Sequence, residues 1–374
     1  MLKNHAIAFA LAACHQSIGN QRFPSVIGNL DKSQSDFRRC SRISDSRHAK
    51  HLPTYDWWFL TNQEVYKSDI TYTSTMKQRI AFIGAGKMAS ALISCIYNKN
   101  LAKSIIASDK SNNNLTKIKK QFKTLKNQRF LGHKQNRDFA VQKIQRIFSH
   151  QKSKGFFSVK TTTSNNEAVK KSDIVFICVK PQDIDDVLYE MRNVVKNQLI
   201  VSIAAGIKLK YLESKLKNKR IIRVMPNINC LAGEMAAGFS ANKYATKQDI
   251  QNVLKLLNSA GIAFQLREDL LDAVTAISGS GPAFFAYFIG AFAEAGIKSG
   301  LPRDVAFKLA AQTALGTGKL LLENNLPPEE LIRMVASKKG TTIAGLNVLK
   351  KHNAKNILIK TINAAVKRSR ELGR

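Results

Sequence analysis

Short apolar runs alternate with helical spans along the middle of the chain. The runs are rich in β-branched residues and predict buried strands at residues 80–83, 105–108, 174–179, 200–203 and 221–225. The spans between them, such as 87–97 and 182–195, carry apolar residues at helical spacing. This alternation predicts an α/β domain whose parallel sheet is covered by helices on both faces.

The pattern changes on both sides of this domain. Residues 1–76 show no sustained period, so we expect a poorly structured extension. From about residue 268 the strands stop, and four or five helices are predicted to begin near Asp269, Pro282, Pro302, Pro327 and Thr342. Proline suits the first turn of a helix because its missing N–H would be unpaired there. We therefore predict an α/β domain at 77–267 and an all-helical domain at 268–374.

The chain is strongly basic: 59 Lys and Arg against 26 Asp and Glu give a net charge of +33. This balance points to nucleic acid, an anionic membrane or a phosphorylated ligand. Much of the charge lies in a basic insert at about residues 123–157, where Asp138 is the only acid. The insert is either a basic amphipathic helix that contacts RNA or a membrane, or a solvated surface insertion. Because the insert supplies so much of the charge, we expect no nucleic-acid partner.

Two apolar stretches resemble membrane signals. Residues 6–14 end in a sequence like a lipoprotein cleavage box at Cys14, and residues 273–293 are uncharged over a length that could cross a bilayer. The second stretch contains Ser-Gly-Ser-Gly-Pro, whose backbone groups a bilayer would leave unsatisfied, so we expect a helix buried between protein layers. The five cysteines include no C-x-x-C pair, which predicts no disulfide frame and no metal site. A cytoplasmic protein without a membrane partner is expected.

A glycine motif carries the first chemical prediction. Residues 80–89 read as a strand that runs into G-x-G-x-x-A and then into a helix. Gly84 permits a tight turn, and Gly86 lets backbone N–H groups approach a pyrophosphate at the positive end of the helix. The context on both sides predicts a Rossmann-type dinucleotide-binding domain rather than a merely structural turn.

The end of the second predicted strand should select the cofactor. An acid there, Asp109, would hold the ribose hydroxyls of NADH, whereas Lys110 with Ser108 could hold the 2′-phosphate of NADPH. Asp109 could instead cap the helix that begins near Asn112. We favour NADPH and leave NADH open.

The distribution of histidines bears on the reaction. Six of the seven lie in the extension or the insert, which leaves only His352 in the regular domains. Oxidation of an alcohol usually needs a base such as His or Lys, whereas an imine nitrogen can arrive already protonated. The enzyme then mainly holds the cation, directs the hydride and excludes water. The pattern modestly favours reduction of C=N over C=O.

Five segments in order resemble the pyrroline-5-carboxylate reductase family. They are residues 84–88 (GAGKM), 179–182 (VKPQ), 202–206 (SIAAG), 223–227 (RVMPN) and 272–283 (DAVTAISGSGPA). The resemblance implies an enzyme that transfers hydride from NAD(P)H to 1-pyrroline-5-carboxylate, the last step of proline biosynthesis. It also implies a dimer or larger homo-oligomer whose substrate site draws on two chains. Rival interpretations are another imine or β-hydroxyacid reductase, or a basic RNA- or membrane-associated protein with an inactive nucleotide fold.

The resemblance also implies site residues. The cofactor would contact Ile83, Gly84, Ala85, Gly86, Lys87, Met88, Asp109, Asn165, Val179, Lys180, Pro181, Ala204 and Ala205. The substrate would contact Glu268, Ser337, Gly340, Thr341 and Thr342. Thr342 would place its hydroxyl on the ring nitrogen as the catalytic residue, although both threonines also suit a helix cap.

The predicted substrate loop departs from the family pattern. The family's loop at this position resembles S-P-G-G-T-T, whereas this chain has Lys338 and Lys339 in place of Pro-Gly. The lysines remove the fixed φ of proline and the freedom of glycine, and they could also attract the substrate carboxylate. Both interpretations stay open from the sequence.

Overall fold

The computed structural model describes residues 78–130 and 157–373, with side chains described for 78–124 and 157–373. All of these lie in one of the two units into which the chain divides, Tyr72–Arg374. The predicted extension at 1–76, the apolar stretch at 6–14 and residues 131–156 of the basic insert lie outside the described residues.

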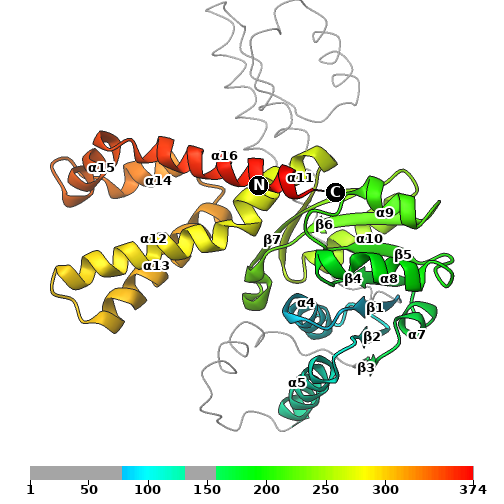
Figure 1. Cartoon of the computed structure of the whole chain (residues 1–374). Helices are drawn as coiled ribbons and strands as arrows, with labels where there is room; N and C mark the ends of the chain where they lie inside the picture. The colour runs from blue at the N-terminus through cyan, green and yellow to red at the C-terminus, as the bar shows by residue number, and fades with distance from the viewer. Residues whose placement is uncertain (1–77, 131–156, 374) are drawn as a thin grey trace, which may run out of the picture. The chain divides into compact units, whose positions relative to one another are not determined.

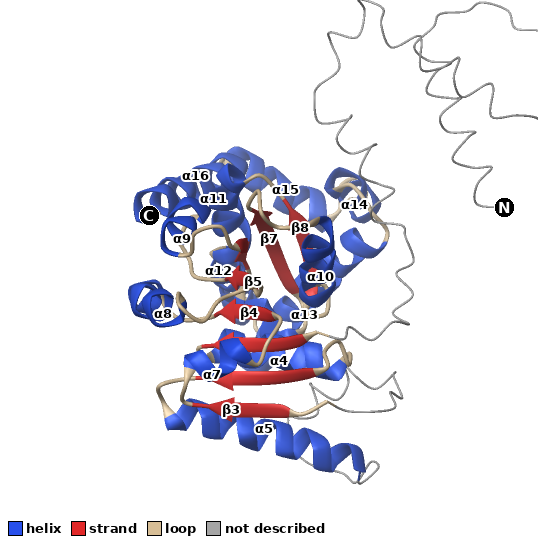
Figure 2. Cartoon of the chain, turned by 90° about the vertical axis from the view of Figure 1, so that its right-hand side faces the viewer, coloured by secondary structure: helices blue, strands red, loops and turns tan. Residues whose placement is uncertain are grey.

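In the described part of the chain, eight strands form a single sheet in the order β3-β2-β1-β4-β5-β6-β7-β8 (Figure 2). Their bounds are β1 Arg79–Ile83, β2 Ser104–Ser108, β3 Val159–Thr162, β4 Ile174–Ile177, β5 Leu199–Ser202, β6 Arg220–Met225, β7 Met235–Ala241 and β8 Gly261–Gln265. Strands β1 to β6 pair in parallel, and β7 runs antiparallel to β6. The chain enters at β1 in the middle and builds outward to β3 before returning to β4. A ligand-binding crevice is expected at this reversal of strand order.

Helices cover both faces of the sheet (Figures 1 and 2). They are α4 Lys87–Asn98, α5 Asn112–Phe130, α7 Asn165–Lys170, α8 Ile184–Met191, α9 Leu209–Lys215 and α10 Lys247–Leu257. One apolar cluster joins Ile80 and Phe82 to α4, α5 and α10, and the other joins Ala81 and Ile83 to α7, α8 and α9. The alternation along β1 follows from strand geometry, because successive side chains point to opposite faces. The central strands are therefore apolar throughout.

Only short turns and helices follow β8 in the described chain. They are η5 Glu268–Leu270, α11 Leu271–Val274, the π-helical turn η6 Thr275–Gly279, α12 Gly281–Lys298, α13 Arg303–Glu323, α14 Pro328–Val335, α15 Thr341–Lys351 and α16 Ala354–Leu372. Helices α12 and α13 pack side by side, and α16 returns to α11 and η6 (Figure 1). The Ser369 hydroxyl donates to the Asp272 carboxylate at 2.6 Å and fastens this return.

The predicted architecture of a Rossmann-type domain followed by a helical domain is confirmed, but four details were wrong. The sheet is not wholly parallel, because β7 pairs with β6 in the antiparallel sense. The strand predicted at 174–179 ends at Ile177, and the helix predicted at 182–195 ends at Met191. The helix predicted from Thr342 is divided near Asn353, whose φ of 51° lies in the left-handed region.

The apolar helix predicted to be buried is exposed in the single chain. On α12, Phe285, Tyr287 and Phe292 keep 66%, 76% and 70% of their surface accessible. By length and composition alone, Glu268–Lys298 could cross a membrane, and 17% of its most apolar window is buried. Such contiguous aromatic exposure is typical of a surface that another molecule covers.

Candidate functional site

The carboxyl ends of four neighbouring parallel strands lie level at one edge of the sheet. Ser108 pairs with Ile83, Ile83 with Ile177, and Ile177 with Ser202. Backbone bonds continue past the strands, because Gly84 N donates to the Ser108 carbonyl at 2.8 Å and Cys178 N to the Ile83 carbonyl at 2.7 Å. The segments that follow these strands, which hold most of the predicted cofactor residues, therefore meet at one edge.

The glycine turn has the geometry that a pyrophosphate requires. Gly84 has a φ of 92°, and a Cβ there would lie 2.9 Å from the Cys178 carbonyl carbon, so only glycine fits. A Cβ on Gly86 would meet nothing within 4 Å, which leaves open space in front of the helix. Gly86 is also the N-cap residue of α4, directly before its first residue, Lys87. The open space and the helix N-terminus together fit a pyrophosphate.

Asp109 is held beside this turn by three donors. Its carboxylate accepts from the Ala85 N–H at 2.7 Å, from the Ser111 N–H at 2.7 Å and from the Asn114 amide at 3.1 Å. The bonds to Ser111 and Asn114 order the start of α5, although Asp109 lies three residues before its first residue and is not its N-cap. The bond to Ala85 ties the same acid to the glycine turn, where the adenosine ribose of a dinucleotide lies in this fold.

The structure disagrees with the prediction that the Ser108 side chain holds a 2′-phosphate. Ser108 is completely buried, and its hydroxyl donates to the Asn165 amide oxygen at 2.7 Å. The Asn165 amide nitrogen in turn donates to Glu190 at 2.8 Å. Both side chains are thus hydrogen-bonded inside the domain, because the Ser108 side chain points into the interior at the end of its strand. Lys110, by contrast, is exposed and lies only 3.8 Å from Asp186.

Two further loops complete the edge. After β4, Val179 is half-buried, Lys180 is exposed, and Pro181 begins the short helix η3 Pro181–Asp183. After β5, Ala204 is buried and Ala205 is exposed. Desolvation raises the pKa of the neighbouring Cys178 thiol.

The buried side chains among the predicted cofactor residues offer only their backbone. Ile83 and Ala85 belong to the core, whereas Lys87 is exposed and Met88 is half-buried at the start of α4. A dinucleotide fits the turn at Gly84–Gly86 and the exposed parts of the neighbouring loops. Within the described residues, no cluster of His, Cys, Asp and Glu could hold a metal ion.

The predicted substrate loop lies at the other end of the helical region. It connects α14 to α15, and both helices lie at the end of α16 that is remote from β1 and α4 (Figure 1). Gly340 precedes the first turn of α15, Thr341 is exposed and Thr342 is half-buried. Ser337 closes over Gly340, where an added Cβ would lie 2.4 Å from the serine hydroxyl. One chain does not bring this loop to the cofactor edge.

Lys339 takes the backbone conformation of a glycine. Its φ is 60°, in the left-handed region that disfavours side chains with a Cβ. The loop therefore keeps a glycine-like turn at this position, and both lysines stay exposed.

Glu268 does not face the substrate loop of its own chain, and its contact with substrate stays a prediction. Its carboxylate accepts from the Arg223 guanidinium at 2.9 Å and from the Leu209 N–H at 2.7 Å. Arg223 is 5% exposed on β6, and Leu209 begins α9 directly after the loop that holds Ala204 and Ala205. The sequence analysis quoted the segment around Arg223 without giving this residue a role. The available signal was a charge inside an otherwise apolar strand.

The C-terminal end of α16 also packs against the loop that holds Ala204 and Ala205. Gly206 has a φ of 76°, and a Cβ there would lie 3.1 Å from the Leu372 carbonyl oxygen at the end of α16. The segment 204–209 thus adjoins both ends of the helical region: Glu268 accepts from the Leu209 N–H, and Leu372 lies close to Gly206.

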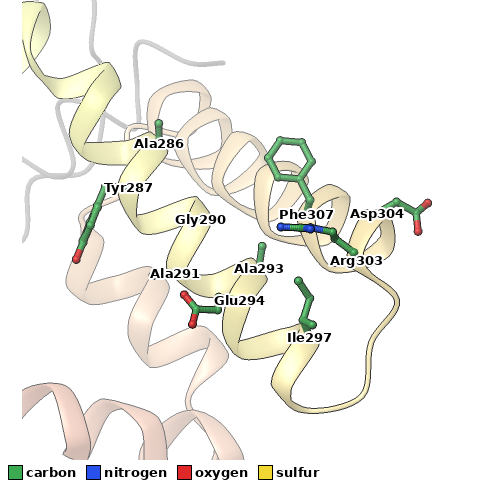
Figure 3. Close-up of a pocket in the computed structure, with 10 residues that line it drawn as sticks. All are labelled: Ala286, Tyr287, Gly290, Ala291, Ala293, Glu294, Ile297, Arg303, Asp304 and Phe307. Atoms are coloured by element: carbon green, nitrogen blue, oxygen red, sulfur yellow. The ribbon is translucent and has the colours of Figure 1, made fainter.

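Helices α12 and α13 form an open groove of about 960 Å³ (Figure 3). Its walls include Tyr287, Ile297 and Phe307, with Glu294 and Asp304 at its margin. The groove is continuous with the exposed aromatic face of α12.

Both domains of the chain are similar to known proteins. The family model described as pyrroline-5-carboxylate reductase dimerisation matches residues 268–372, and one described as NADP oxidoreductase, coenzyme F420-dependent, matches 79–206. A pyrroline-5-carboxylate reductase of Pseudomonas aeruginosa is 36% identical over 298 residues, which are 79% of this chain and 96% of the relative. One of Methanosarcina acetivorans is 40% identical over 58% of this chain and 81% of the relative.

Solved structures agree with the sequence relatives. A pyrroline-5-carboxylate reductase of Coxiella burnetii has a TM-score of 0.68 and 27% identity, and the match covers 80% of this chain and 99% of that one. The Plasmodium falciparum pyrroline carboxylate reductase with NADP bound has a TM-score of 0.62 and 27% identity, over 80% of this chain and all of that one.

Proposed function

The chain belongs to the pyrroline-5-carboxylate reductase family, and we propose on this premise that it reduces 1-pyrroline-5-carboxylate to L-proline. Hydride adds to the carbon of the C=N bond of the protonated imine, whose π electrons become the nitrogen lone pair of the secondary amine. The observation that carries the proposal is the match across 96% of a named reductase. The edge of the sheet that fits a dinucleotide lies within the matched part of the chain. The rival β-hydroxyacid and inactive-fold interpretations are not favoured.

The cofactor is a nicotinamide dinucleotide, which supplies the hydride when bound. The turn at Gly84 and Gly86 receives its pyrophosphate, and Asp109 stands at its ribose. We propose a preference for NADPH, supported by the exposed Lys110 at the end of β2 and by the NADP-bound relative. Asp109 leaves NADH as the competing cofactor, because a carboxylate there binds a free 2′-hydroxyl and repels a phosphate.

The substrate loop at 337–342 binds the ring and the carboxylate of the substrate. The N–H groups of Gly340 and Thr341 at the start of α15 suit the carboxylate, because helix N-termini favour anions. The Thr342 hydroxyl lies on the ring nitrogen and fixes the face that the C=N carbon presents. Thr342 orients the imine and does not need to act as a strong acid.

The working enzyme is a dimer or a larger homo-oligomer. In one chain the loop at 337–342 stands at the end of α16 remote from the cofactor edge (Figure 1). The aromatic face of α12 also stands uncovered. A second copy that covers α12 and brings its own loop to the edge accounts for both features. We place this enzyme in the cytoplasm.

A spectrophotometric assay tests the proposal. The full chain is mixed with 1-pyrroline-5-carboxylate and NADPH or NADH, and coenzyme oxidation is compared with the amount of proline formed. We expect one proline per coenzyme oxidised, with faster turnover for NADPH. Coenzyme binding in calorimetry without any imine-dependent oxidation would instead assign the chain to another reductase of the same fold.

A further inference from the structure

The outward face of α5 carries an unbroken cluster of lysines. Its members are Lys117, Lys119, Lys120 and Lys123, all exposed, and we call them the α5 lysines. Ile118 and Phe122 of the same helix are buried against α4 and the sheet. At about 100° per residue, the lysines therefore fall on the arc that faces away from the core.

The lysines of α12 and α13 pair with acids of their own helix, whereas within the described residues those of α5 and α16 do not. Helices α12 and α13 pair Lys298 with Glu294, Lys308 with Asp304 and Lys319 with Glu323. Residues 112–130 contain no acid at all. Within the described residues, none of the α5 lysines has an ion-pair partner.

The spacing of the α5 lysines makes them repel one another. Lys117 and Lys120 are three residues apart, and Lys119 and Lys123 are four apart, so neighbours on the helix surface share the same charge. Like charges at these spacings weaken a helix. A polyanion laid along the face would remove this repulsion.

Strand β3 packs beside α5 at the sheet edge (Figure 2), and its Val159 joins the same core cluster as Ile118 and Phe122. Lys160 therefore points to the opposite face of the sheet, beside Glu167 of α7, and is not part of this surface. No large apolar side chain is exposed on the described part of α5 or on β3. A membrane-binding helix needs an apolar face to insert, and single-stranded nucleic acid needs aromatic side chains on which bases stack. This face offers neither, and it suits the phosphates of a duplex.

We propose that the α5 lysines form a docking surface for the phosphate backbone of a nucleic-acid duplex, read without base specificity. This differs from the expectation drawn from the sequence, which attributed the basic charge to the insert. The surface lies at the β3 edge of the sheet, opposite to β7, β8 and the helices that follow them. The helical region therefore lies away from this surface, and duplex binding does not depend on the proposed reductase activity.

The test measures duplex binding by fluorescence anisotropy with the full chain. The probes are an RNA duplex and a DNA duplex of one sequence, about 20 base pairs long, at about 50 and 200 mM salt. The variant replaces all four α5 lysines by alanine. A matched control replaces Lys196, Lys210, Lys217 and Lys247, which are exposed elsewhere on the domain, so that both variants lose the same net charge.

The expected result is a loss of affinity and of salt dependence in the α5 variant alone. Four phosphate contacts give a slope of about −3.6 in log affinity against log salt, so a fourfold rise in salt costs about 150-fold. We expect this part of the salt dependence to be lost in the α5 variant and kept in the control variant. The two duplexes distinguish RNA from DNA as the source of the phosphates.

Several outcomes would overturn the proposal. Equal losses in both variants would show that binding follows net charge and not this surface. No duplex binding by the unaltered chain, or α5-dependent binding to anionic lipid vesicles in its place, would also refute it. Thermal unfolding of both variants, measured by circular dichroism, establishes that they are folded.

Discussion

Removing the Glu268 carboxylate should destabilise the protein through Arg223. In Glu268→Ala, the 5% exposed guanidinium loses the carboxylate at 2.9 Å, and the Leu209 N–H loses its acceptor. Breaking a fully buried ion pair on one side costs about 3–5 kcal/mol. Glu268 keeps 28% of its side-chain surface accessible, so partial solvation lowers our expectation to about 2 kcal/mol.

A double-mutant cycle separates this ion pair from a substrate contact. Urea unfolding, followed by circular dichroism at fixed protein concentration, is measured for Arg223→Met, Glu268→Ala and the double variant. We expect the double variant to be more stable than the sum of the single losses predicts, because it leaves no buried charge unpaired. A coupling energy below about 0.5 kcal/mol would refute the reasoning. If Glu268 instead served the substrate, Glu268→Gln would raise the KM for the imine without lowering the free energy of unfolding.

Four further changes test other parts of the structure. Thr342→Val should cut kcat by about 100-fold while NADPH affinity in calorimetry is kept, and Thr342→Ser should retain most activity; unchanged kinetics in Thr342→Val would remove its role. Asp109→Ser should shift the kcat/KM ratio towards NADPH by about tenfold, and an unchanged ratio would place the acid away from the ribose. Lys339→Gly should raise the free energy of unfolding by about 1 kcal/mol, because it relieves a φ of 60°; a loss of stability would contradict this. Arg79 lowers the pKa of Asp173, so its stabilisation, under about 1 kcal/mol for an exposed pair, is lost as the pH falls through the lowered pKa. Asp173→Asn should show no such loss in acid titrations of stability.

The strands β1, β2, β4, β5 and β6 could be predicted from the sequence because each is a compact β-branched run between helical spans. Strands β7 and β8 could not. Their sequences, MAAGFSA and GIAFQ, are rich in Ala and Gly, which have low strand propensity. Pairing with β6 and packing against α10 decide their conformation, and these are tertiary effects.

The site divides in the same way. The glycine turn could be predicted because Gly84 and Gly86 act locally, on one turn between a strand and a helix. The contacts of Ser108 and Glu268 could not, because their partners lie 57 and 45 residues away in the sequence. A sequence motif gives the residue type at a position, whereas a side chain's direction depends on what the fold places beside it.

The segment 204–209 joins cofactor chemistry to the movement of the helical region. It is hydrogen-bonded at Leu209 to Glu268, and at Gly206 it lies close to the end of α16. Because both ends of the helical region adjoin this one loop, we expect a tilt of the helices, including one imposed by subunit assembly, to shift Ala204 and Ala205.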